Sequence, residues 1–178
     1  DGGTVQGTDG NTYNIRSLTS IGATPDPEGE YSVDLQTFRN SATSVASGQL
    51  STIGGGRNNT ASGANTTIGG GFANEAIGRF ATIPGGNGLL ASSFAETSLG
   101  AYNEASGGTP LSWVATDPVL TVGNGQSSSA RSTALTVLKN GNVGIGETAP
   151  AQRLHIDNED ANLQTIRVED LAVTASGT

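Results

Sequence analysis

The fold is decided by residues 46–104, where one short pattern occurs four times. Cut at the alanine that opens each copy, the stretch reads ASGQLSTIGGGRNNT (46–60), ASGANTTIGGGFANE (61–75), AIGRFATIPGGNGLL (76–90) and ASSFAETSLGAYNE (91–104). The period is fifteen residues, falling to fourteen in the last copy. Fifteen residues are too few for two helices and their turns, but they suit one coil of a β-solenoid with two short strands and two tight turns.

The aligned columns assign a role to each part of the coil. Each isoleucine is expected to stack on its counterpart about 4.8 Å away along the axis, whereas a flexible Gly/Ser linker would keep no such column. The glycine triplets are predicted to form corners with positive φ, which glycine adopts most readily. The predicted core column is Ile53, Ile68, Ile83 and, shifted by one position, Leu99. The predicted turn glycines are Gly54, Gly55, Gly56, Gly69, Gly70, Gly71, Gly85 and Gly86. Asn58, Asn59 and Asn74 are expected at similar left-handed positions.

Composition narrows the class of protein. The 178 residues include 27 glycines and only 13% charged residues, which favours thin layers with closely approaching backbones over a thick core. The net charge is −8 and Lys139 is the single lysine, so we expect neither a nucleic-acid partner nor attraction to an anionic membrane. No apolar run is long enough to insert into a bilayer. The absence of cysteine excludes disulfides and thiolate metal sites.

The flanks of the repeat read as further β-structure. Asp9-Gly10 and Asn140-Gly141, each between β-prone runs, predict hairpin turns. We therefore expect four segments: an N-terminal hairpin and connector (1–44), the coils (45–108), a β-hairpin neck (109–156) and an acidic C-terminal strand segment (157–178). The chain begins with Asp1 and has no methionine, so we expect a processed chain or a piece of a longer one.

Residues suited to catalysis are few. His155 is the only histidine, and its place between Leu154 and Ile156 predicts a structural role in a strand. The sequence contains no nucleophile elbow and no phosphate-binding loop. We therefore expect no enzyme activity, no catalytic residue, no bound metal and no cofactor.

The carboxylates have two interpretations. A pair of them could cleave a glycoside, but Glu75, Glu96 and Glu104 show no recurring pairing and are expected to be solvated turn residues. The acidic group Asp26, Glu28, Glu30 and Asp34 does not match the spacing of a calcium loop, so a solvated loop is expected there.

If the chain binds a receptor or another ligand, the contacts are expected on loops that interrupt the repeat. Tyr102 and Trp113, in the stretch that leaves the coils, are the candidate contact residues, and residues 86–90 and the tail from Asp157 are further candidates. Trp113 is either a sugar-stacking platform or, as we favour, a plug at the end of the thin core.

The longer segments resemble a known family. The ASG…STIGGG…N coils, together with YSVDLQTFRNSATSVASG (31–48), NGNVGIG (140–146) and RLHI (153–156), resemble the β-roll repeats of trimeric adhesin heads and, more closely, of phage tail-fibre proteins. The resemblance implies left-handed parallel coils in an intertwined homotrimer. In such relatives the NGNVGIG…P…LH segment often precedes a self-cleaving chaperone domain.

The expected function is a structural and receptor-binding segment of an extracellular phage tail fibre. Its partners would be two further copies of the chain, other tail or fibre proteins, and a glycan or protein receptor on the host surface. The alternatives are a bacterial trimeric adhesin or filament at the cell surface and, less favoured, a fragment of a carbohydrate-degrading tailspike.

Overall fold

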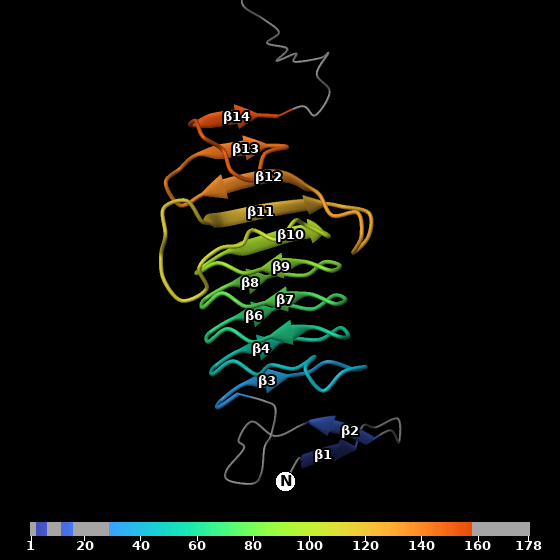
Figure 1. Cartoon of the computed structure of the whole chain (residues 1–178). Helices are drawn as coiled ribbons and strands as arrows, with labels where there is room; N and C mark the ends of the chain where they lie inside the picture. The colour runs from blue at the N-terminus through green and yellow to red at the C-terminus, as the bar shows by residue number, and fades with distance from the viewer. Residues whose placement is uncertain (1–2, 7–11, 16–28, 158–178) are drawn as a thin grey trace, which may run out of the picture.

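The computed structural model describes residues 3–6, 12–15 and 29–157, and within these ranges the chain is all-β, without a helix. The coils stack along one axis, with the later strands continuing the stack toward the C-terminal end (Figure 1). This confirms a parallel β-solenoid, of about 8 turns. The strands are β1 (Gly3–Gln6), β2 (Thr12–Ile15), β3 (Val33–Asp34), β4 (Thr52–Ile53), β5 (Thr60–Ala61), β6 (Thr67–Ile68), β7 (Glu75–Ala76), β8 (Thr82–Ile83), β9 (Leu90–Ala91), β10 (Thr97–Ala101), β11 (Pro118–Asn124), β12 (Thr133–Leu138), β13 (Val143–Ile145) and β14 (Leu154–Ile156).

Two sheets run along the solenoid axis. One has nine strands in the order β14-β13-β12-β11-β10-β8-β6-β4-β3, and the other has three, β5-β7-β9. Strands β3 to β11 of the larger sheet pair in parallel, and Ile53 lies opposite Ile68, which lies opposite Ile83. The register therefore repeats the fifteen-residue period, and equivalent residues of successive coils share one column.

The core lies between these two sheets and is made of small and branched side chains. The three isoleucines are fully buried, as the sequence predicts, and the alanines that open the copies are buried beside them. The core cluster is Ala46, Ile53, Ala61, Ile68, Ala76, Ala81, Ile83, Leu89 and Ala91. A single chain thus buries the isoleucine column without a partner.

The left-handed corners are only partly those that the sequence predicts. The third glycine of each triplet has positive φ, 79° at Gly56 and 95° at Gly71, whereas the first two glycines do not. The first glycine is required for another reason, because a Cβ on Gly54 or Gly69 would overlap the backbone of the next coil. The second glycine, as at Gly70, faces open space.

Two predicted turn asparagines are also placed differently. Asn58 has a φ of 55°, as expected, but Asn59 and Asn74 are buried and do not adopt positive φ. The Asn74 side chain donates to the carbonyl oxygens of Gly70 and Gly86, and its oxygen accepts from the Leu89 amide of the next coil. These asparagines therefore form an amide column that links coils, a role that turn statistics do not reveal.

The flanking strands form a separate hairpin near the N-terminus and extend the larger sheet at the C-terminal end. Strands β1 and β2 pair antiparallel, and β12 and β13 pair antiparallel around Asn140 and Gly141. Strand β3 lies in the segment expected to be a connector, yet it pairs in parallel with β4. The stack of coils therefore begins before residue 45. The expected strand in the tail beyond Asp157 lies outside the described residues.

We predict that alanine substitutions at two neighbouring glycines differ in their effect on stability. Gly71→Ala places a Cβ at positive φ and against the Gly86 carbonyl, and should lower the free energy of unfolding by at least about 2 kcal/mol. Gly70→Ala, the matched control, meets nothing closer than 3.9 Å and should change it by less than about 0.5 kcal/mol. Thermal unfolding followed by circular dichroism would compare them. Equal melting temperatures would contradict the corner assignment.

Candidate binding surfaces

Leu99 is not part of the core, which corrects the prediction from the sequence. The register pairs Thr97 with Thr82, so Ser98 occupies the isoleucine column and is fully buried. Leu99 points the other way and is 36% exposed. Because successive side chains of a strand face opposite sides, the one-residue shift moves apolar side chains from the inner to the outer face of the sheet.

This inversion continues to the end of the sheet. On the inner face the column after Ser98 is Thr121, Thr136, Gly144 and His155, and it contains no large apolar residue. The outer face carries two columns of apolar side chains, aligned by the same pairings and partly or largely exposed. The outer apolar face, as we name it, consists of Leu99, Leu120, Val122, Leu135, Val137, Val143, Ile145, Leu154 and Ile156.

The first two residues of the inner column, Ser98 and Thr121, contact a buried carboxylate. Glu96 is fully buried, so the expectation of a solvated turn carboxylate is wrong for this residue. Its Oε2 accepts from the backbone amides of Ser92 and Ser93, at 3.0 and 2.9 Å. Its Oε1 accepts from the hydroxyls of Ser98 and Thr121.

The position of Glu96 explains why the carboxylate is needed. In the second and third copies, the equivalent amide pairs donate to a carbonyl of the following coil, as Ile77 and Gly78 do to Ala91. In the fourth copy the carboxylate accepts both bonds instead. Glu96 therefore caps the C-terminal end of the coils, the kind of end residue that a solenoid requires.

A second polar cap closes the opposite end. The Gln36 side chain accepts from the Asn59 amide and donates to the Asn59 carbonyl, so Gln36 takes the place of a preceding asparagine in the amide column. Asp34, expected in a solvated loop, is buried instead. Its carboxylate accepts from the Ala46 amide and forms an ion pair with Arg39 at 3.1 Å. Asp34 and Arg39 lie five residues apart, and neither Gln36 nor Glu96 belongs to a recurring motif, so sequence reasoning had no strong signal for either cap.

The two candidate receptor residues lie in different environments. Tyr102 is partly buried: its ring packs against Gly88, and the Arg131 guanidinium lies 5.9 Å from the ring centroid. Trp113 is 60% exposed, so it does not plug the core of the single chain. Of the two, Trp113 is the more available for contact. In the 86–90 stretch, Gly88 and Leu89 are buried, which leaves little of that loop exposed.

The remaining ionisable groups are scattered. The His155 Nδ1 lies 3.9 Å from Glu147, in a partly exposed strand. Burial lowers the pKa of Lys139, while the negative charges of Asp117 and Glu96 oppose that shift. Within the described ranges, no three His, Cys, Asp or Glu side chains converge as a metal site would require. The same ranges contain no helix with the length and apolar character of a membrane span.

The chain matches no protein-family model, no curated protein and no solved structure.

We predict that the Glu96 cap stabilises the solenoid. Glu96→Ala removes the acceptor for two backbone amides and should lower the free energy of unfolding by at least about 3 kcal/mol. Glu104→Ala, at an exposed position in the same copy, should change it by less than about 0.5 kcal/mol. Chemical denaturation at neutral pH measures both. A Glu96→Ala protein as stable as the control would show that the carboxylate does not act as a cap.

Proposed function

We propose that the chain is a structural, receptor-binding segment of a trimeric extracellular fibre, and specifically of a phage tail fibre. The observation that supports this proposal is the outer apolar face. Its nine side chains continue across five strands, and a contiguous apolar surface of this kind marks an interaction site. The inner column beneath it holds Thr121, Thr136, Gly144 and His155, and Leu138 is the buried large apolar side chain of β12, so this end of the chain has little apolar core of its own.

The partner that best fits this face is a second and a third copy of the chain. The face belongs to the same sheet as the coils. Copies that pack against one another through this face would therefore have their solenoid axes side by side. In an oligomer with closed symmetry, the outer apolar face of every copy would be buried. The resemblance of the repeats to trimeric fibres supports three copies, and a β-roll repeat protein is compatible with the solenoid.

The structure of the coils favours a spacer and display function. Their backbone hydrogen bonds run from coil to coil, and both ends are capped, which makes a short rigid rod. Receptor contacts on three parallel rods would gain avidity without new contacts, by about 10² to 10⁴. Trp113, in the loop between β10 and β11, is the exposed residue best suited to such a contact.

Two alternatives remain distinguishable. A bacterial surface adhesin would share the trimer and the coils, and the genes beside its own would encode cell-envelope proteins instead of tail proteins. A tailspike fragment would need paired carboxylates, and Glu96 is committed to capping. Release of reducing ends from host polysaccharide by the purified chain would favour the tailspike.

We predict that a charge in the outer apolar face prevents assembly. Ile145→Lys should convert the trimer to monomers at micromolar concentration, because an ammonium would be buried in an apolar contact. Leu111→Lys is the control, since Leu111 is 74% exposed and lies outside the sheet. Light scattering coupled to size exclusion gives the mass. A wild-type chain that is folded and monomeric would refute the proposed assembly.

A further inference from the structure

One edge of the coil stack presents large apolar side chains at positions where the backbone has positive φ, a conformation that is unfavourable for such residues. The register places Tyr31, Leu50, Asn65 and Phe80 in one column, two residues before the paired threonines and Val33. All four have positive φ, between 57° and 63°. Asparagine tolerates this conformation, but bulky residues rarely adopt it. Tyr31, Leu50 and Phe80 are nevertheless exposed, so neither the turn nor the core explains their size.

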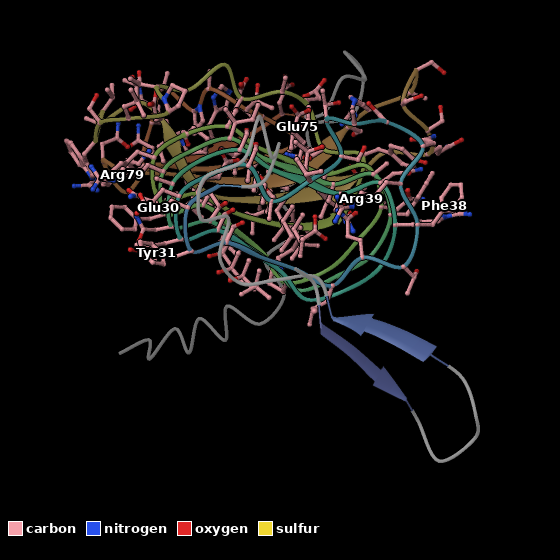
Figure 2. The ribbon with its side chains drawn as sticks, turned by 90° about the horizontal axis from the view of Figure 1, so that it is seen from below. Glu30, Tyr31, Phe38, Arg39, Glu75 and Arg79 are labelled. Carbon is pink, nitrogen blue, oxygen red and sulfur yellow. The ribbon has the colours of Figure 1, made fainter. Side chains whose placement is uncertain are left out.

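The loop between β10 and β11 adds to this edge. The Arg79 amide donates to the Pro110 carbonyl and the Phe94 amide to the Thr109 carbonyl, at 2.8 and 3.0 Å. These bonds hold the loop against the coils on the side where Figure 2 shows Tyr31 and Arg79, while Phe38 lies at the opposite edge. The loop carries the exposed side chains of Leu111 and Trp113.

Local contacts fix the positions of several rings and polar groups on this edge. The Phe80 and Phe94 rings meet edge to face at 5.5 Å, and the Arg79 guanidinium lies 4.9 Å from the Phe80 centroid. The Gln49 amide donates to the Glu30 carboxylate at 2.9 Å. The edge is therefore preorganised by local contacts, which lowers the entropy cost of binding.

We propose that this aromatic edge, defined by Tyr31, Leu50, Phe80 and Trp113, binds a linear neutral glycan that runs along the solenoid axis. The inference rests on the proposed receptor-binding function and names its ligand class and site. Exposed rings offer flat apolar surfaces for the C–H faces of sugar rings, and Arg79, Gln49 and Asn65 supply donors for hydroxyls. The net charge of −8 disfavours an acidic polymer.

Two features distinguish this edge from a contact between copies of the chain. The Glu30 carboxylate lies beside Tyr31 among the apolar residues of the edge, and acidic residues are depleted at protein interfaces. The outer apolar face, by contrast, is free of charge across five strands. Self-association is thus already served by another surface.

The test measures binding of the full chain to immobilised dextran, pullulan and mannan, with alginate and hyaluronate as acidic polymers. Phe80→Asn removes a ring and introduces the residue that the same column accepts at position 65, so the fold should persist. Trp113→Ala removes the loop ring. Each should weaken binding of the neutral polymers by about tenfold. Phe38→Asn, an exposed ring at the opposite edge, is the control and should change binding by less than about twofold.

Each result is decisive for this assignment. Absence of binding to all three neutral polymers, preference for the acidic ones, or equal losses in the control would overturn it. A change of oligomeric state in Phe80→Asn or Trp113→Ala would assign the edge to self-association and overturn it too. A trimer that binds no neutral polymer refutes the glycan alone, whereas a monomer that binds one through Phe80 refutes only the assembly.

Discussion

The hydrogen bonds between successive coils are the interactions on which the rest of the structure depends. Each coil has a slender apolar interior of an isoleucine and a few alanines, too little to hold fifteen residues in place alone. The backbone bonds and the buried asparagine amides fix every coil in register with the next. That register stacks the isoleucines and demands a glycine wherever two backbones approach too closely for a Cβ. It also creates a specific problem at the ends, where a coil has no neighbour.

Side chains solve that problem at both ends. Gln36 accepts the hydrogen bond that an asparagine of a preceding coil would accept, and Glu96 accepts those that a carbonyl of a following coil would accept. Past Glu96 the sheet continues, but its apolar side chains change face. The inner column becomes hydroxyl-rich around the buried carboxylate, and the outer face becomes apolar. A shift of one residue, between Ile83 and Leu99, therefore separates the coils, which have an apolar core of their own, from strands β10 to β14, whose apolar side chains are available for association.

The sequence was sufficient for the solenoid and insufficient for its ends. Periodicity predicted the coil length, the parallel stack and the isoleucine column, because those features repeat and repetition is visible. It misplaced Leu99 because the alignment of the copies placed Leu99 in the isoleucine column despite a shift of one residue. In a strand, a shift of one residue moves the side chain to the opposite face of the sheet. It also misassigned Glu96 and Asp34, since a carboxylate in a polar stretch reads as solvated until its backbone partners are known. The edge occupied by Tyr31 and Phe80 was missed because a positive φ at a bulky residue has no sequence signature.

The caps have a consequence for how such a rod changes in evolution. Gln36 accepts a hydrogen bond from the Asn59 amide, and Glu96 accepts hydrogen bonds from amides within its own copy. Neither cap therefore depends on how many copies lie between them. Duplication or loss of one near-identical copy, the ordinary outcome of recombination between repeats, would lengthen or shorten the rod by one rung, about 4.8 Å. The distance between whatever flanks the coils is therefore a discrete, heritable quantity, adjustable without redesigning either end.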